Sequence, residues 1–149
     1  MLSRKVLLSV LSVVLVAGVT VWAGEVKLEG IKCVVLAKPA TAGKSADHKD
    51  GKVYFCCGNC AGKFAASPEK FATKANMQLV ATKQYEQKTC PLTGMPLNPE
   101  TKVKVGDAEV AFCCNNCKGK VEAAEGDKQL EMVFEEKAFK KAGFAKVGS

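Results

Sequence analysis

The chain contains eight cysteines, which fall into two sets of four with the same internal spacing. The first set is Cys33, Cys56, Cys57 and Cys60, and adding 57 to each number gives the second set, Cys90, Cys113, Cys114 and Cys117. The same offset relates further identical pairs: Pro39 and Pro96, Asp50 and Asp107, Val53 and Val110, Phe55 and Phe112, Asn59 and Asn116, Gly62 and Gly119, Lys63 and Lys120. A frame shared by every cysteine indicates an internal repeat. We therefore expect one small fold that is used twice.

Each repeat predicts an α+β unit made of a cysteine knuckle, a β-hairpin and a short helix. In the second repeat, residues 90–94 carry turn residues, and residues 102–105 and 109–112 alternate on either side of a Gly106–Asp107 turn. The first repeat has a matching turn at Asp50–Gly51 and a strand at 52–55. Helices are expected at about 59–66 and 116–124, followed in the first repeat by a helix with Ser67 as its cap and Pro68 in its first turn.

The N-terminal residues have the three regions of a secretory signal peptide. Arg4 and Lys5 precede an apolar run over 6–21, and Val21-Trp22-Ala23 supplies small residues at the positions that a signal peptidase recognises. An uncleaved membrane anchor is the alternative, although the run is short for a span of about 20 residues. We expect an exported protein, periplasmic or secreted, that contacts a membrane only through this segment if it stays uncleaved.

The predicted organisation is a signal peptide at 1–23, a first module at 31–73, a linker at 74–87, a second module at 88–139 and a tail at 140–149. The linker is polar, with a strand expected at 78–81, and the tail is expected to fray. Removing Arg4 and Lys5 takes the formal charge from +7 to +5. Because the lysines are spread along the chain without a block of five, solubility explains the charge and no nucleic-acid partner is expected.

The cysteine spacing favours metal binding. A hairpin that folds back brings the lone cysteine of each repeat beside the Cys-x3-Cys pair, whose members are four residues apart on one expected helix face. Such thiolates bind soft or borderline ions, chiefly Zn(II) and Cu(I). The predicted ligands are six cysteines: Cys33, Cys56, Cys60, Cys90, Cys113 and Cys117. Cys57 and Cys114 are second-choice ligands, because neighbouring side chains on a helix diverge by about 100°, and become fourth ligands if the first helical turn is irregular.

Two other uses of the cysteines remain open. An even number of cysteines in a short exported chain is typical of a disulfide framework, but each clustered set of three has only Cys33 or Cys90 nearby as a partner. The two Cys-x2-Cys pairs that begin at Cys57 and Cys114 also allow thiol–disulfide exchange, because thiol pKa values fall at helix starts. The βαβ setting of such oxidoreductases is missing here.

Four segments resemble the YHS/TRASH group of metal-binding domains. They are residues 90–96 together with 112–117 in the second repeat, and residues 54–60 together with 67–71 in the first. The resemblance implies treble-clef zinc-finger-like modules linked to heavy-metal trafficking, resistance or sensing. The family's three-cysteine pattern falls on Cys33, Cys56 and Cys60 and on their counterparts in the second repeat. The Tyr-His-Ser signature that names one branch is absent, and Cys33-Val34-Val35-Leu36 departs from the family knuckle.

Other residues suggest no catalytic site. His48 is the only histidine and is expected in an exposed loop, with a role as a fourth ligand as the alternative; Met95 either binds Cu(I) or packs under its knuckle; Phe55 and Phe112 are expected in the core. No acid–base set is visible, so we expect no enzyme. The predicted function is an exported carrier, buffer or sensor of Zn(II) or Cu(I), whose partners are the metal ion and a metal transporter or another exported protein.

Overall fold

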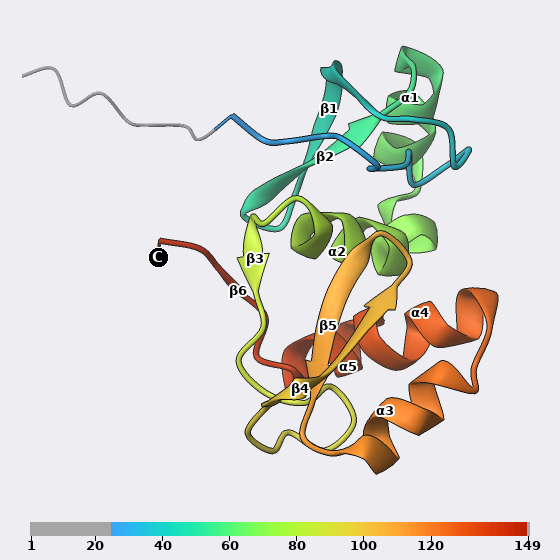
Figure 1. The fold of residues 1–149 in the computed structure, drawn as a ribbon. Coiled ribbons are helices and arrows are strands. Elements are labelled where there is room, and N and C mark those ends of the chain that lie inside the picture. Colours follow the sequence, from blue (N-terminus) through green and yellow to red (C-terminus); the bar gives the residue numbers. More distant parts are fainter. Residues whose placement is uncertain (1–24, 149) are drawn as a thin grey trace, which may run out of the picture.

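The computed structural model describes residues 25–148, so the predicted signal peptide lies outside the described residues. In chain order the elements are β1 (Thr41–His48), β2 (Gly51–Phe55), α1 (Gly58–Ala66), the 3-10 helix η1 (Pro68–Phe71), α2 (Ala72–Ala81), β3 (Tyr85–Glu86), β4 (Asn98–Val105), β5 (Ala108–Phe112), α3 (Asn115–Glu122), α4 (Gly126–Phe134), α5 (Glu136–Lys141) and β6 (Ala145–Lys146). The first repeat forms one end of the molecule and the second repeat forms the other, with α2 between them (Figure 1).

The predicted α+β architecture is confirmed, with a hairpin followed by a short helix in each repeat. The hairpin strands β1 and β2 have the same bounds as β4 and β5 once 57 is added, and both hairpins are antiparallel. Both also contain a register shift near the start of the first strand, between Thr41 and Ser45 and between Asn98 and Val103. The equivalence of the two repeats therefore extends from the sequence to the details of strand pairing.

A tight knuckle precedes each hairpin, and its backbone geometry is the same in both repeats. The N–H of Cys33 donates to the carbonyl of Lys38 at 2.7 Å, and the N–H of Cys90 donates to the carbonyl of Met95 at 2.9 Å. The fifth residue has a positive φ in each knuckle, 53° at Ala37 and 76° at Gly94. The first repeat thus forms its knuckle without the glycine that favours this conformation.

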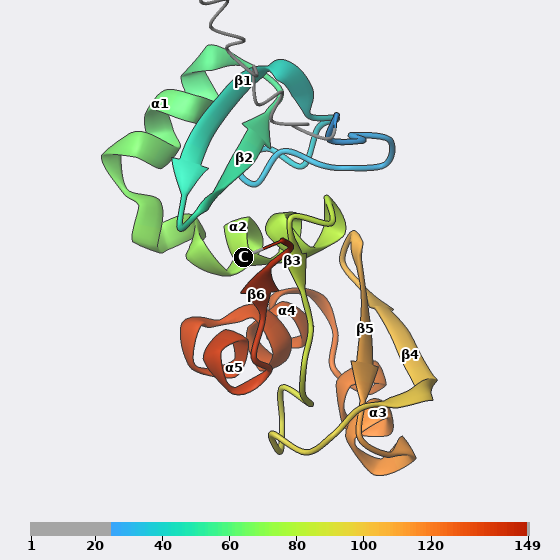
Figure 2. The same cartoon turned by 90° about the vertical axis from the view of Figure 1, so that its left-hand side faces the viewer.

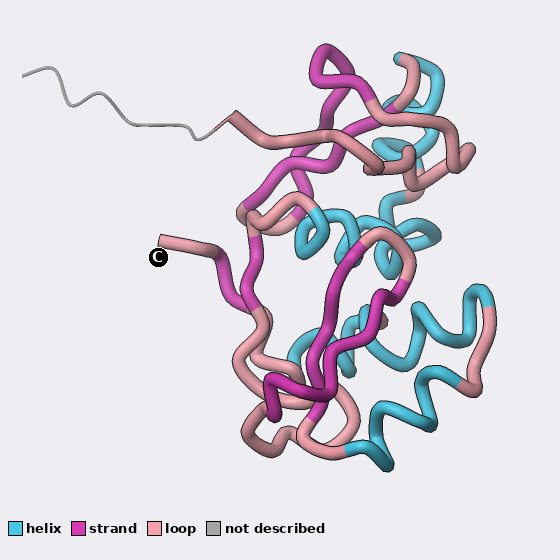
Figure 3. The backbone as a smooth tube through the Cα atoms, viewed as in Figure 1, coloured by secondary structure: helices cyan, strands magenta, loops and turns pink. Residues whose placement is uncertain are grey.

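Helix α2 corrects the prediction of a polar linker with a strand at 78–81. Six consecutive residues of this helix, from Ala75 to Val80, are buried, so no polar face marks the helix in the sequence. The buried amides of Asn76 and Gln78 are satisfied by partners on opposite sides. Asn76 Nδ2 donates to the carbonyl of Phe134 at 2.9 Å, whereas Gln78 Nε2 donates to the carbonyl of Tyr54, also at 2.9 Å. A segment that looked polar is therefore the central helix of the molecule (Figure 3).

The prediction of a frayed tail at 140–149 is also wrong for its described part. Helix α5 continues to Lys141, Ala142 is fully buried, and the ring of Phe144 stacks on Phe139 with centroids 4.6 Å apart. Strand β6 then pairs antiparallel with β3. The sequence concealed this order because only two large apolar side chains, Phe144 and Val147, follow α5.

One buried cluster of side chains extends through both repeats. It includes Phe55 and Phe112, both 0% exposed as predicted, together with residues of α2, α4 and α5. The turn of each hairpin is docked against central elements as well. The Nζ of Lys49 lies 2.9 and 2.8 Å from the two carboxylate oxygens of Glu136, and a Cβ added at Gly106 would lie 2.2 Å from Met77 Sδ. The two repeats are consequently packed together (Figure 2).

Among the described residues, no helix combines the length and the apolar composition that crossing a membrane requires.

Candidate metal centres

The first candidate centre brings together the knuckle and the start of α1. Cys33 lies on the knuckle, Cys56 directly follows β2, and Cys60 lies in the first turn of α1. Their three sulfur atoms lie within 4.8 Å of one another, and Cys56 Sγ is 3.7 Å from Cys60 Sγ. Cys33 and Cys60 are 2% and 1% exposed, whereas Cys56 is half-buried. The hairpin therefore performs the expected task of folding the chain back onto its own knuckle.

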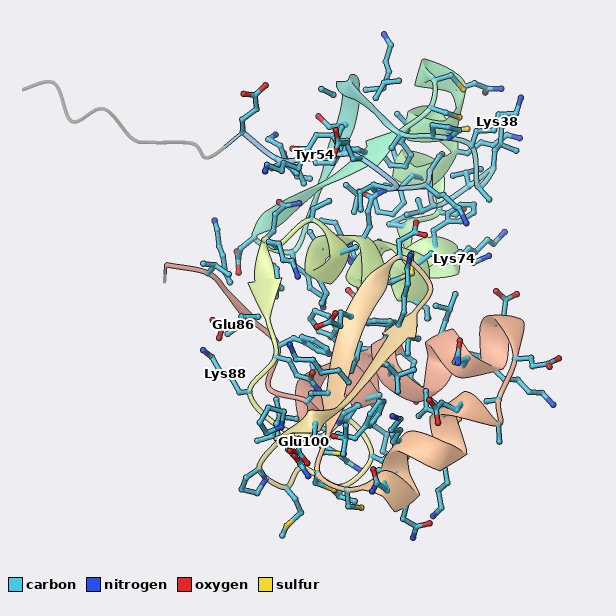
Figure 4. All side chains as sticks on the ribbon, viewed as in Figure 1. Lys38, Tyr54, Lys74, Glu86, Lys88 and Glu100 are labelled. Carbon is cyan, nitrogen blue, oxygen red and sulfur yellow. The ribbon has the colours of Figure 1, made fainter. Side chains whose placement is uncertain are left out.

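The second candidate centre repeats this arrangement at the opposite end of the molecule. Cys90, Cys113 and Cys117 have their sulfur atoms within 4.8 Å of one another, and Cys113 Sγ is 3.6 Å from Cys117 Sγ. In Figure 4, Lys38 on the first knuckle and Glu100 near the start of β4 mark the two ends, and Lys74 on α2 lies between them. Within the described residues, both candidate groups consist of cysteines alone.

The sulfur spacing fits a tetrahedral ion. Zinc–sulfur bonds of about 2.3 Å in a tetrahedron place neighbouring sulfurs about 3.8 Å apart. The Sγ–Sγ separations of 3.7 Å and 3.6 Å agree with that edge, whereas a disulfide requires about 2.05 Å. All eight cysteines are free, and the triads contain only soft thiol donors. The residues present therefore suit a thiophilic ion such as Zn(II) or Cu(I).

The convergence has a different local cause from the one predicted. The sequence placed both members of each Cys-x3-Cys pair on one helix face, but α1 begins at Gly58 and α3 at Asn115. Cys57 and Cys114 are the N-cap residues and are extended, with φ near −158° and −160°. The chain thus approaches each site from a strand and turns into the helix only after the second cysteine.

The adjacent cysteines lie at the border of each triad. Cys57 Sγ is 3.5 Å from Cys60 Sγ and 3.9 Å from Cys56 Sγ, and Cys114 Sγ is 3.7 Å from Cys113 Sγ. Because these residues precede the first helical turn, the 100° divergence that demoted them as ligands does not apply. Cys57 is half-buried and Cys114 is exposed. Neither sulfur belongs to the group whose members lie within 4.8 Å of one another, so each borders its triad without completing it.

The knuckles favour the thiolate form of their cysteines. Burial raises the pKa of Cys33, but the backbone N–H groups of Cys56, Leu36 and Val35 outweigh it, so that the pKa is lowered. Burial likewise opposes ionisation of Cys90, but the side chain of Thr93 and the backbone N–H of Cys113 lower its pKa to about 7. A preformed thiolate is the state that a metal ligand requires.

The helical cysteines have the opposite tendency. Burial raises the pKa of Cys60 to about 12, and burial raises that of Cys117 to the same value. Cys57 and Cys114 differ, because the backbone N–H of Cys60 and that of Cys117, respectively, lower their pKa values. Each site thus combines cysteines with lowered thiol pKa values, at the knuckle and at the N-cap, with a buried cysteine whose thiol pKa is raised. A bound cation favours the deprotonated form of that buried thiol.

Two glutamines that sequence reasoning missed hold the knuckles against the hairpins. Gln78 Nε2 donates to the carbonyls of Lys32 and Tyr54, both at 2.9 Å. Gln87 Nε2 donates to the carbonyls of Thr89 and Ala111 at 3.0 and 2.8 Å. These bonds fix the residue before each knuckle cysteine beside the strand that leads to the pair. No cysteine motif includes either glutamine, so the repeat pattern carries no signal for them.

His48 and Met95 differ from their predictions. His48 is half-buried at the end of β1, where its Nε2 lies 2.9 Å from Asn76 Oδ1, so it is neither an exposed loop residue nor a member of the first triad. Met95 is 58% exposed and therefore does not pack under its knuckle.

Comparison of the chain with protein-family models, curated proteins and solved structures found no match. The resemblance to YHS/TRASH domains consequently rests on the residues around the two cysteine triads.

Proposed function

We propose that this chain is an exported metal-binding protein that holds one Zn(II) or Cu(I) ion in each cysteine triad and acts as a carrier, buffer or sensor of that metal. The observation that carries the proposal is the convergence of three sulfurs within 4.8 Å in each repeat, with Cys56–Cys60 and Cys113–Cys117 separations near a tetrahedral edge. Binding, rather than catalysis, is the proposed role. Export rests on the N-terminal residue pattern alone.

The open side of each site supports exchangeable cargo rather than a purely structural ion. Structural zinc sites are closed by four protein ligands, whereas each group here contains three cysteines, with the fourth cysteine at the solvent border. Cys114 is exposed, and Cys56 and Cys113 are half-buried. A thiol of a partner protein can reach such a position and take over the ion by stepwise ligand exchange.

A metal titration of the reduced protein tests the proposal. Zn(II) or Cu(I) should bind at about two ions per chain, and a Cys56→Ser/Cys60→Ser variant and a Cys113→Ser/Cys117→Ser variant should each bind about one. Metal analysis of protein purified directly from the compartment to which it is exported, with a count of free thiols, shows whether the sites are loaded there. If the reduced protein binds no ion and all eight cysteines resist alkylation before reduction, the cysteines serve as a disulfide framework instead.

Thiol–disulfide exchange is the second candidate, because one specific contact favours it. Cys57 Sγ is 3.5 Å from Cys60 Sγ, and the backbone N–H of Cys60 lowers the pKa of Cys57, as the attacking thiol of a Cys-x2-Cys pair requires. Insulin reduction separates the two candidates. Turnover that is lost in Cys57→Ser while metal binding survives would favour the oxidoreductase. Under our proposal Cys56→Ser weakens metal binding more than Cys57→Ser does, and no turnover is seen.

A further inference from the structure

We propose that Asp107, at the tip of the second hairpin, is a positioning residue for the first metal site and couples the occupancy of the two sites. The inference rests on the proposed function and goes beyond it by assigning a role to a residue outside both triads. Its basis is a set of contacts around Lys32, the residue that precedes Cys33.

Asp107 binds the backbone of the first repeat. Its Oδ2 accepts a hydrogen bond from the N–H of Lys32 at 2.9 Å, and its Oδ1 lies 3.8 Å from Lys32 Nζ. The Asp107 side chain is 9% exposed, so this carboxylate is largely withdrawn from water. The carbonyl of Lys32 is held from the other side by Gln78 Nε2 at 2.9 Å. Both backbone groups of the residue before Cys33 are therefore fixed by partners outside the knuckle.

The second hairpin is seated so that Asp107 reaches this position. Gly106 has a φ of 62°, and a Cβ there would lie 2.2 Å from Met77 Sδ, so the turn approaches α2 more closely than any other residue would permit. The N–H of Asp107 donates to the same sulfur at 3.4 Å. A cavity of about 190 Å³ separates this turn from the first knuckle and is lined in part by Cys33, Met77, Asp107 and Leu130. Asp107 is thus a direct polar link beside an otherwise incompletely filled contact.

The same hairpin carries a ligand of the second site. Cys113 directly follows β5, which begins one residue after Asp107. An ion bound by Cys113 and its partners fixes one end of the hairpin, and the opposite end holds Lys32 beside Cys33. Metal in the second site thereby stabilises the conformation that the first site needs. Because coupling free energy is reciprocal, metal in the first site must raise the affinity of the second by the same factor.

The equivalent contact in the second repeat has another source. Thr89 corresponds to Lys32, and its N–H donates at 2.8 Å to the carbonyl of Ala142, which follows α5. Asp50 corresponds to Asp107, and its N–H donates to Tyr85 Oη at 3.2 Å. The tip of the first hairpin therefore docks on Tyr85 of β3, and Asp50 provides a matched control position for Asp107.

Zn(II) affinities measured by chelator competition test the coupling. The variants Cys113→Ser/Cys117→Ser and Cys56→Ser/Cys60→Ser report the first and the second site alone. In the wild type, two ions should bind about tenfold more tightly than the product of these single-site constants, the factor expected for one charge-assisted hydrogen bond. Asp107→Ala should remove this excess. It should also lower the Zn(II) affinity of the isolated first site and leave that of the isolated second site unchanged. Asp50→Ala should retain the excess.

A structural defect gives a different pattern. The coupling role is wrong if Asp107→Ala weakens both isolated sites equally. It is also wrong if the tenfold excess in two-ion affinity is absent from the wild type or survives in Asp107→Ala. In each of these cases the proposed function stands. Asp107→Asn keeps an oxygen acceptor of the same size, so it should recover part of the first-site affinity and decides the matter if Asp107→Ala fails to fold. A wild type that binds no Zn(II) and no Cu(I) overturns the proposed function and this inference together.

Discussion

Gln78 and Gln87 make the same three hydrogen bonds in the two repeats, although the repeat offset does not relate them. Gln78 bonds the carbonyl of Lys32 and both backbone groups of Tyr54. Gln87 bonds the carbonyl of Thr89 and both backbone groups of Ala111. Thr89 and Ala111 are the 57-residue counterparts of Lys32 and Tyr54, but the positions equivalent to Gln78 and Gln87 are Glu135 and Gly30. The first clamp comes from a helix after its repeat, and the second from the chain entering its repeat.

Replacing these glutamines should lower the unfolding free energy to different extents. Gln78→Met leaves three backbone groups without partners around a fully buried side chain, and we expect a loss of about 3 kcal/mol in unfolding free energy. Gln87 is half-buried, so Gln87→Met should cost about 1–2 kcal/mol. Urea unfolding measures both losses. Gln129→Met, which removes a single bond to the carbonyl of Val121, is the control; an equal cost for all three variants would contradict the clamp.

The two knuckles predict substitutions of opposite sign. Ala37 has a φ of 53°, which costs an L-residue about 1 kcal/mol relative to glycine, so Ala37→Gly should stabilise the first repeat by up to that amount. Gly94 has a φ of 76°, so Gly94→Ala should destabilise the second repeat by about 1 kcal/mol. No clash adds to this cost, because a Cβ there meets only Lys141 Cγ at an ordinary 3.6 Å. Thermal unfolding of the reduced, metal-loaded protein checks both signs. A stabilising Gly94→Ala would show that backbone conformation does not limit the knuckle.

Acidification should empty the first site before the second. Metal binding requires thiolates, so a lower thiol pKa lets a site keep its ion to a lower pH. Thr93 helps to lower the pKa of Cys90 to about 7, whereas the counterpart of Thr93 in the first repeat is Leu36, which has no hydroxyl. Thr93→Leu should therefore raise the pH at which the second site releases Zn(II), and Leu36→Thr should lower it for the first. Zn(II) release is followed as a function of pH in the two variants that keep one site each. If neither Thr93→Leu nor Leu36→Thr shifts the pH midpoint of release, this cause is wrong.

Metal removal should unfold the two ends of the molecule and spare its centre. The knuckles and the starts of α1 and α3 converge on cysteines, whereas α2, α4 and α5 share one buried cluster. Amide hydrogen exchange of the reduced, metal-free protein should lose protection in the hairpins and in α1 and α3, and retain it in α2 and α4. Restoring Zn(II) should restore protection at the ends. Uniform protection without metal would show that the fold stands unaided, and uniform loss would show that the shared core is insufficient.

The sequence predicted the repeated unit but not how the two units join. Knuckle, hairpin and short helix follow from turn residues and alternation near Cys90 and Val110, which are local signals. The helical state of residues 72–81 could not be predicted in this way, because Asn76 and Gln78 are polar residues buried by partners far along the chain. Amphipathic periodicity disappears when a helix is covered on all sides.

The candidate site shows the same division. The cysteine spacing shared by the two repeats was enough to group Cys33 with Cys56 and Cys60, because a hairpin between them brings the chain back beside the knuckle. It did not reveal that Cys57 caps the helix in an extended conformation, because sequence patterns place helix ends only to within a few residues. Asp107 was visible as a repeated residue, but its contact with Lys32 depends on the packing of one repeat against the other.

Helix α2 makes the duplication indivisible. Asn76 holds the second repeat through Phe134, and Gln78, two residues later, holds the first repeat through Lys32 and Tyr54. A cut before this helix takes Gln78 from the first repeat, and a cut after it takes Asn76 from the second. Either cut exposes an apolar surface of α2 where Met77 or Leu79 was covered. The single copy of α2 bonds to both repeats, so a substitution within it affects both ends of the molecule.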